Sequence, residues 1–420
     1  MSLRIHPGTV KGAVSAPPSK SYTHRAYLLG LLAEGTTTVR DGLASEDPRA
    51  TLQGIEELGA LVTRGAPTLI ESDGRLRPAK ATIDCLNSGT TLRLLTAIAS
   101  LASGTTTLTG DASLRKRPMR PLAESLRRLG VEVSLTEGKA PITVSGPMNG
   151  GRTELPGDIS SQFVSALLLA GARTKDGVEV AIQGTLKSRP YVDITIEMME
   201  DFGARVQRRG EGFVVAGGQS YRARDYRVPG DFSTAAFPLV AAAIAGDVRV
   251  DNLPAKTAQG DKAILDHLEL FGAKVVRDPR SARVAAAPLR GAQIDLSDTP
   301  DAFPALCALA AHAQGETILS GAAHLRFKES DRIHAMVSNL QKMGIDATER
   351  EDGAVIRGGI VRRAKGLVTE GDHRILMALA VCALRAEGPI ELDDHECFSV
   401  SYPGFLDDMR KLGAKMEVVA

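Results

Sequence analysis

Residues 55–62 read IEELGALV, a helix tail that runs into a glycine and then into a short β-like segment. The same signature occurs five more times, as SLRRLGVEV, MEDFGARV, LELFGAKVV, LQKMGIDAT and MRKLGAKMEV. The repeated glycines are Gly59, Gly130, Gly203, Gly272, Gly344 and Gly413, with successive spacings of 71, 73, 69, 72 and 69 residues. A glycine after a helical pattern is typical of a left-handed C-cap, where a Cβ is disfavoured, so each copy predicts the end of a helix.

A second signature keeps the same period: a polar turn, an Ala/Leu-rich helix, another glycine and a Thr/Val-rich strand. These helices are expected to begin near residues 20, 89, 160, 232, 301 and 373. Because they are nearly all apolar, they should be buried and covered by sheets. The glycine-ended helices should open with proline, at Arg117-Pro118, Arg189-Pro190 and Tyr402-Pro403. The pattern therefore predicts an α/β chain of six βαβ-type units.

The polar turns before the buried helices are candidate anion sites. A helix N-terminus carries about half a positive charge and unsatisfied N–H donors, so several tips facing the same way would favour a phosphorylated ligand. Ser, Asp and Asn at such positions are also ordinary N-caps, whereas a cation there opposes the helix dipole unless an anion binds. The tip residues are Lys20, Ser21, Arg25, Asn87, Ser88, Thr90, Ser160, Ser161, Gln162, Asp231, Ser233, Asp298, Asp301, Asp372, His373 and Arg374.

Another candidate anion site lies in residues 326–332, RFKESDR. If this segment opens a helix, the i, i+4 spacing places Lys328 and Arg332 on one helix face. Like charges repel there unless an anion lies between them, which favours a ligand over a solvated charge run.

The composition excludes several classes of protein. The net charge of +1 gives no overall field to attract nucleic acid or a membrane, and 4% aromatic residues argue against a base-stacking surface. The first twenty residues lack the apolar core of a signal peptide, so a cytoplasmic protein is expected. The eight histidines and four cysteines show neither HxxxH nor CxxC spacing, so no metal site is expected and the cysteines should be reduced thiols.

Eight motifs together resemble the family of 5-enolpyruvylshikimate-3-phosphate synthases, from Ser19 to Pro403. Each is similar to a family segment, and all eight occur in the family's order. They are Ser19-Lys20-Ser21 with Arg25, residues 86–91 (LNSGTT) with Arg93, residues 111–118 (DASLRKRP), residues 160–162 (SSQ), residues 188–191 (SRPY), Pro300-Asp301, residues 326–332 (RFKESDR) and residues 372–374 (DHR).

The resemblance implies two similar domains of three units each, residues 18–228 and residues 1–17 with 229–420. It implies a site where helix N-termini of both domains face each other, and domain closure that excludes water from the reaction. The implied activity is transfer of the enolpyruvyl group of phosphoenolpyruvate to shikimate 3-phosphate, in aromatic amino acid biosynthesis. It implies no cofactor, metal, nucleic acid or membrane, and a monomer is expected.

The resemblance also carries residue roles onto matching positions. Shikimate 3-phosphate contacts are implied for Lys20, Ser21, Arg25, Ser160, Ser161, Gln162, Ser188, Asp301, His324 and Lys328. Phosphoenolpyruvate contacts are implied for Lys20, Gly89, Arg117, Gln162, Arg332 and Arg374. For catalysis, the hypothesis is that Asp301 takes the proton of the acceptor hydroxyl, while Glu329 and Lys20 manage proton transfer at the enol carbon.

Two positions depart from the family pattern. Val400 precedes Ser401-Tyr402-Pro403, where the family usually has a lysine, so one expected phosphoenolpyruvate cation is missing. His324 stands where many relatives have asparagine, which would make that hydrogen bond depend on pH.

Other kinds of protein share some of these sequence features. The UDP-N-acetylglucosamine enolpyruvyl transferases share the six-unit fold, but the loop of residues 111–118 lacks their reactive cysteine. A non-catalytic or nucleic-acid-binding repeat protein is a second alternative, which RNA titration would test. A P-loop kinase is excluded because GxxxxGK[ST] is absent.

Overall fold

The computed structural model describes residues 1–419 and divides into two compact units. One unit is the continuous segment Pro18–Val228; the other joins Met1–Pro17 to the chain from Pro229 onward. Both units are built from helices and mixed sheets, so the predicted α/β class is confirmed.

The unit of residues 18–228 has three helices buried along almost their whole length. They are α1 (Lys20–Leu32), α3 (Gly89–Ala99) and α5 (Ser161–Gly171). Three more helices end at the repeated glycines and bury one face. They are α2 (Glu46–Glu57), α4 (Arg120–Arg128) and α6 (Arg189–Asp201), and a short 3-10 helix, η1 (Leu114–Lys116), precedes α4.

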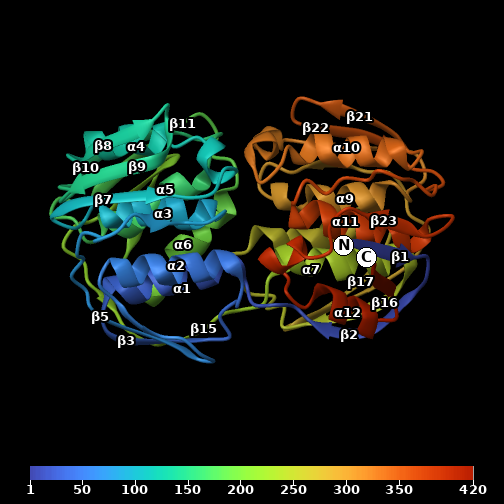
Figure 1. Cartoon of the computed structure of the whole chain (residues 1–420), viewed down its shortest axis with the longest axis horizontal. Coiled ribbons are helices and arrows are strands. Elements are labelled where there is room, and N and C mark those ends of the chain that lie inside the picture. Colours follow the sequence, from blue (N-terminus) through green and yellow to red (C-terminus); the bar gives the residue numbers. More distant parts are fainter. Residues whose placement is uncertain (420) are drawn as a thin grey trace. The chain divides into compact units, whose positions relative to one another are not determined.

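Three sheets in this unit share one topology, in which a parallel pair is followed by an antiparallel hairpin. Their orders are β14-β3-β5-β4 with β15 also on β3, β6-β7-β9-β8, and β10-β11-β13-β12. The strands are β3 (Ala33–Arg40), β4 (Leu61–Thr63), β5 (Thr68–Asp73), β6 (Ile83–Asp84), β7 (Gly104–Thr109), β8 (Glu132–Thr136), β9 (Lys139–Gly146), β10 (Gly151–Pro156), β11 (Val178–Gln183), β12 (Val206–Arg209), β13 (Gly212–Val215), β14 (Tyr221–Arg222) and β15 (Asp225–Arg227). Figure 1 shows the β3–β5 and β7–β9 sheets on opposite sides of α1, α2 and α3.

The second unit repeats the arrangement of helices and, in two of its three sheets, the same strand topology. Its buried helices are α7 (Phe232–Ala245), α9 (Phe303–Ala310) and α11 (His373–Cys382), and its glycine-ended helices are α8 (Ile264–Leu270), α10 (Arg332–Lys342) and α12 (Phe405–Lys411). Its 3-10 helices are η2 (Gly260–Ala263), η3 (Pro300–Ala302), η4 (Ala323–Phe327), η5 (Ala383–Arg385) and η6 (Cys397–Val400). Its strands are β1 (Ser2–His6), β2 (Val10–Ser15), β16 (Gly246–Asp251), β17 (Lys274–Asp278), β18 (Ser281–Ala285), β19 (Gln293–Asp295), β20 (Glu316–Ser320), β21 (Asp346–Arg350), β22 (Gly353–Arg357), β23 (Ile390–Leu392) and β24 (Lys415–Val419).

The first strands of the chain complete two sheets of this second unit. Strand β2 pairs in parallel with β16, in the sheet β17-β18-β16-β2. Strand β1 lies between β23 and β24 and is antiparallel to both, with Leu3 opposite Leu392 and Val418. These pairings explain why residues 1–17 belong to the unit formed by the end of the chain.

The six repeated glycines have the conformation that the sequence predicts. Their φ angles lie between 80° for Gly344 and 111° for Gly59, the left-handed region that penalises a Cβ. The prediction about prolines was correct only for α6, which begins at Arg189 with Pro190 in its first turn. Helix α4 begins two residues after Pro118 and has Pro121 in its first turn instead, and α12 begins two residues after Pro403.

Candidate active site

The N-termini of α3 and α5 meet through one glutamine. Gln162, in the first turn of α5, donates from Nε2 to Thr90 Oγ1 at 2.8 Å and accepts at Oε1 from Arg93 Nη1 at 2.7 Å. Ser88 caps α3 by accepting from the Thr91 amide, and Ser160 caps α5 by accepting from the Gln162 amide. The predicted residues Ser160, Ser161 and Gln162 therefore lie beside the start of α3.

Lys20, the first residue of α1, has a carboxylate partner that the sequence analysis missed. Its ammonium group donates to Asp47 Oδ2 at 2.9 Å, and both side chains are mostly buried. Asp47 lies in the first turn of α2, and its backbone carbonyl accepts from Thr91 Oγ1 at 3.3 Å. Asp47 thus fixes the catalytic candidate Lys20 close to the start of α3.

Arg25 is a buried cation whose hydrogen-bond acceptors are all uncharged. It is 1% exposed and donates to the Thr195 and Ser165 hydroxyls and to the Ser21 and Tyr191 carbonyls. Burial lowers the pKa of its guanidinium to about 10. Across residues 1–419 it forms no ion pair with a carboxylate, so an anionic ligand would supply the missing counter-charge.

Arg117 and Gly89 lie against each other at the start of α3. Arg117 is 5% exposed and donates from Nη2 to Asn87 Oδ1 at 2.5 Å. A Cβ on Gly89 would come within 2.9 Å of Arg117 Nη1, so the absence of a side chain at Gly89 leaves room for the guanidinium beside the helix N-terminus. Free amides and a nearby cation are the groups that bind phosphate.

Ser188 takes an unusual backbone conformation before α6. It is the N-cap residue, with φ 55° and ψ 34°, and is largely buried. A serine held in the left-handed region is a sparsely populated state that concentrates at ligand sites. Ser188 belongs to the same unit as Ser21, Arg25 and the start of α5.

In the second unit, Arg374 connects the N-termini of all three buried helices. It lies in the first turn of α11 and donates from Nη2 to Ser233 Oγ of α7 at 2.9 Å. It donates from Nη1 to the Asp301 carbonyl at 3.2 Å, and Asp301 lies in the 3-10 turn before α9. Asp231 caps α7 and Asp372 caps α11 through bonds to backbone amides.

Arg332 is enclosed by three carboxylates. Its Nε donates to Asp372 Oδ2 at 2.8 Å, its Nη1 to Asp301 Oδ1 at 2.9 Å, and its Nη2 to Glu329 Oε2 at 2.8 Å. Asp372 is fully buried and also accepts from Ser330 Oγ at 3.0 Å. Burial opposes the ionisation of Asp372, but Arg332 keeps the pKa of that carboxyl below its ordinary value.

Asp301, the proposed base, is surrounded by cations. Its carboxylate lies 2.9 Å from Arg332, 3.5 Å from Lys328 and 3.5 Å from Arg374. Burial alone would raise the pKa of Asp301, but Lys328, Arg374 and Arg332 together hold it well below the ordinary value. The group is therefore ionised at neutral pH and only weakly basic while these cations stay on it.

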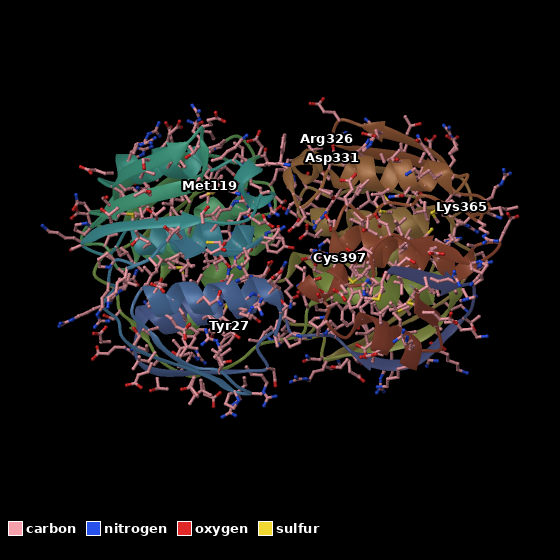
Figure 2. All side chains as sticks on the ribbon, viewed as in Figure 1. Tyr27, Met119, Arg326, Asp331, Lys365 and Cys397 are labelled. Atoms are coloured by element: carbon pink, nitrogen blue, oxygen red, sulfur yellow. The ribbon has the colours of Figure 1, made fainter. Side chains whose placement is uncertain are left out.

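The segment that carries Lys328 and Glu329 is fixed at both ends. Arg326 donates to Asp331 Oδ2 at 2.8 Å, and the two side chains lie side by side in Figure 2. Arg326 also donates to the carbonyls of Glu351 and Arg350, and Asp331 caps α10 by accepting from the His334 amide.

The prediction that Lys328 and Arg332 share a helix face is wrong. Helix α10 begins at Arg332, and Lys328 has an extended backbone after η4. The two cations still converge, because both contact the Asp301 carboxylate. His324 lies within η4, four residues before Lys328, in the same segment.

The candidate residues thus form two clusters, one in each unit. The first cluster contains Lys20, Ser21, Arg25, Gly89, Arg117, Ser160, Ser161, Gln162 and Ser188. The second contains Asp301, Lys328, Glu329, Arg332 and Arg374, and His324 lies in the segment that leads to Lys328. Sequence reasoning missed the residues that hold these side chains, namely Asp47, Ser165 and Thr195. Only Asp47 left a local signal, as an acidic residue in a first helical turn.

No three His, Cys, Asp or Glu side chains in the described part of the chain are grouped as a metal site would require. None of the helices within residues 1–419 is both long and apolar enough to span a bilayer.

Comparison with known proteins gives matches along almost the whole chain. The family profile described as EPSP synthase (3-phosphoshikimate 1-carboxyvinyltransferase) matches residues 5–409. The chain is 45% identical to a 3-phosphoshikimate 1-carboxyvinyltransferase of Methanocorpusculum labreanum, over 419 residues and 99% of each protein. It is 45% identical to one of Methanocella arvoryzae, over 428 residues and 100% of each. A solved structure of EPSP synthase from Acinetobacter baumannii matches with a TM-score of 0.85 and 31% identity, covering 100% of both chains.

Proposed function

This chain belongs to the EPSP synthase family, the 3-phosphoshikimate 1-carboxyvinyltransferases, and we propose that it performs the family's reaction with the two clusters described above. The enzyme transfers the 1-carboxyvinyl group of phosphoenolpyruvate to the 5-hydroxyl of shikimate 3-phosphate and releases phosphate, within aromatic amino acid biosynthesis. The observation that carries the proposal is the set of buried cations at helix N-termini in both units, Arg25 above all, because it has only neutral partners.

Shikimate 3-phosphate is assigned to residues of both clusters. Arg25, with its buried positive charge, provides the main cation in the first unit, and charge-assisted bonds to such a group contribute about 1.5–3 kcal/mol each. The serine hydroxyls and the Gln162 amide at the helix starts supply neutral hydrogen bonds. The full assignment is Lys20, Ser21, Arg25, Ser160, Ser161, Gln162, Ser188, Asp301, His324 and Lys328.

Phosphoenolpyruvate is assigned to cations that already contact anions or amide oxygens of the protein. Arg332 and Arg374 suit its carboxylate, because a guanidinium can bind a carboxylate with two parallel bonds. Lys20, Arg117 and the start of α3 at Gly89 suit its phosphate. Gln162 completes this set. Val400 occupies the position where the family usually has a lysine, and it contributes no charge.

The proton transfers follow from this assignment. Asp301 removes the proton from the 5-hydroxyl as the oxygen attacks C2 of phosphoenolpyruvate, while Glu329 with Lys20 delivers a proton to C3. The resulting tetrahedral adduct then loses a proton from C3 and expels phosphate, which forms the enol ether. Both steps are balanced without a metal, an oxidant or a further reactant.

Binding of phosphoenolpyruvate would also prepare Asp301 for its role. When the substrate carboxylate engages Arg332 and Arg374, these cations are shared between two anions and favour ionisation of Asp301 less strongly. The pKa of Asp301 then rises from its depressed value, and its carboxylate becomes a better proton acceptor. Asp301 therefore becomes a stronger base only when phosphoenolpyruvate is bound.

Two further points are proposed for the enzyme in the cell. We place it in the cytoplasm, where its cysteines, Cys85, Cys307, Cys382 and Cys397, would remain the free thiols that they are in this structure. We further propose that it acts as a monomer, since this chain supplies a residue for every substrate contact assigned above. Size-exclusion chromatography with light scattering tests the second point directly.

The function is tested by phosphate release from the purified protein. Phosphate should appear only when shikimate 3-phosphate and phosphoenolpyruvate are both present, and mass spectrometry should detect the enol ether product. Release with UDP-N-acetylglucosamine as acceptor would instead assign the chain to the alternative enolpyruvyl transferases. That outcome is disfavoured because the loop of residues 111–118 contains no cysteine.

A further inference from the structure

Arg25 donates hydrogen bonds to two side-chain hydroxyl groups. Two of its four acceptors, the Ser21 and Tyr191 carbonyls, belong to the backbone and would remain after any substitution of those side chains. The other two are the Thr195 hydroxyl, 2.7 Å from Nε, and the Ser165 hydroxyl, 3.4 Å from Nη2. We infer that Thr195 and Ser165 are positioning residues that hold the Arg25 guanidinium in the orientation in which it binds shikimate 3-phosphate. This inference rests on the proposed function.

Thr195 is well suited to such a role because its own position is fixed. It lies in the middle of α6 and is fully buried. Its Oγ1 lies 2.8 Å from Ser165 Oγ and 3.0 Å from the Tyr191 carbonyl, so its single hydroxyl proton can point to one of these and leave a lone pair for Arg25. A β-branched side chain in a helix has few rotamers, which limits the movement of the acceptor.

The neutrality of these acceptors matters for the charge of the site. Arg332 shows the other arrangement, in which three carboxylates surround a buried guanidinium and neutralise it. Hydroxyl groups at Thr195 and Ser165 satisfy the N–H donors of Arg25 without adding negative charge. The positive charge of Arg25 therefore remains available for an incoming phosphate or carboxylate.

The helices that carry these groups are joined beside Arg25. Tyr22 of α1 is almost fully buried and donates from its hydroxyl to Glu197 Oε1 of α6 at 2.9 Å. This bond lies one turn from Arg25 on α1 and two residues from Thr195 on α6. It holds the two helices together independently of the Arg25 contacts, so loss of the Thr195 hydroxyl should leave α6 in place.

Thr195→Val tests the inference, because valine keeps the shape of threonine and lacks the hydroxyl. We expect the KM for shikimate 3-phosphate to rise about tenfold, while kcat and the KM for phosphoenolpyruvate stay within about threefold. Thr195→Ser, which keeps the hydroxyl, should have the same KM for shikimate 3-phosphate as the unsubstituted enzyme. The matched control is Thr96→Val: Thr96 is fully buried on α3 and donates to the Leu92 carbonyl four residues earlier, but it does not contact Arg25.

Several outcomes would overturn the inference. Two of them concern Thr195→Val itself: an unchanged KM for shikimate 3-phosphate, or equal changes in the KM values for both substrates. The other two concern the companion variants: an equal rise of the KM for shikimate 3-phosphate in Thr96→Val, or no recovery of that KM in Thr195→Ser. If Thr195→Val does not fold, Ser165→Ala replaces it. This variant should raise the KM for shikimate 3-phosphate about threefold and leave the KM for phosphoenolpyruvate unchanged. An unchanged KM for shikimate 3-phosphate would contradict the inference. Failure of the proposed function is distinct, since the unsubstituted enzyme would then release no phosphate from the substrate pair.

Discussion

Arg332 donates from Nη1 to Oδ1 of Asp301 at 2.9 Å, so a substrate-binding candidate and the proposed base are in direct contact. Arg374 and Lys328 lie 3.5 Å from the same carboxylate. The base is therefore ionised and strongly paired until a substrate anion competes for its cations. Under the proposed assignment, this contact would couple the binding of phosphoenolpyruvate to the pKa of the Asp301 carboxyl.

Replacing Asp301 with asparagine should nearly abolish turnover. The variant keeps the shape of the side chain and removes the proton acceptor, so kcat should fall by about 10²–10⁴, the usual contribution of general acid–base catalysis. Both substrates should still bind, as measured by calorimetry. Asp298→Asn is the matched control: Asp298 was also a candidate from the sequence, but it is exposed and belongs to neither cluster, so this variant should turn over at the normal rate. A near-normal rate for Asp301→Asn would remove Asp301 from the mechanism.

Replacing Arg374 with lysine should weaken the binding of phosphoenolpyruvate. Lysine keeps the positive charge but cannot make two parallel bonds to a carboxylate, a loss of about 1.5–3 kcal/mol for one charge-assisted bond. The KM for phosphoenolpyruvate should therefore rise about 10- to 100-fold in steady-state assays. The KM for shikimate 3-phosphate serves as the internal control and should change little. An increase confined to that second KM would reverse the substrate assignment.

Replacing Gly89 with alanine should affect binding and stability in opposite ways. The added methyl group would lie 2.9 Å from Arg117 Nη1 and 3.3 Å from Arg93 Nη1, so these flexible side chains must move away. The KM for phosphoenolpyruvate should rise several-fold. Stability in urea should be unchanged or higher by up to about 1 kcal/mol, because alanine favours a helix over glycine. A clear loss of stability would show that the backbone, and not Arg117, absorbs the methyl group.

Acid should destabilise the protein partly through His24. Burial first, and then Lys20 and Arg25, hold the pKa of His24 well below its ordinary value of 6.5, so the native state keeps the ring neutral. Below about pH 6.5 the unfolded chain gains a proton that the native protein does not bind. The free energy of unfolding should then fall by up to about 1.4 kcal/mol per pH unit for this group.

Urea denaturation at several pH values between 7.5 and 5 measures this effect. His24→Asn should reduce the slope of stability against pH by about one proton in that range. His312, whose pKa burial lowers to about 4, remains in the variant, so part of the slope should persist. An identical slope in both proteins would mean that His24 is protonated in the native state.

Features with a local cause were predictable from the sequence. Each repeated glycine follows one helix and adopts a positive φ, because the end of a helix can be read from a few neighbouring residues. For the same reason, the starts of the buried helices that the sequence predicts lie within about two residues of the observed starts. The largest difference is α9, which begins at Phe303 after a 3-10 turn that contains Asp301.

Features that depend on distant segments were not predictable. Asp47 lies on a helix whose start carries no anion-binding pattern, and Thr195 lies in the middle of α6, six residues after its start. Their importance comes from contacts with Lys20 and Arg25 across the fold. The grouping of Lys328 with Arg332 was expected for the wrong reason, since it depends on the Asp301 carboxylate and not on a helix face. A sequence period identifies equivalent positions but does not reveal which side chains meet.

The pairing of β1 and β2 with strands from the other end of the chain has a consequence for biosynthesis. Residues 18–228 are contiguous, so their three sheets can form while the ribosome is still adding the second half. The first seventeen residues must wait, because β16, β23 and β24 are made much later. Closing such long loops is slow, and the nascent polypeptide should therefore fold residues 18–228 first and add its first seventeen residues to the second unit only at the end.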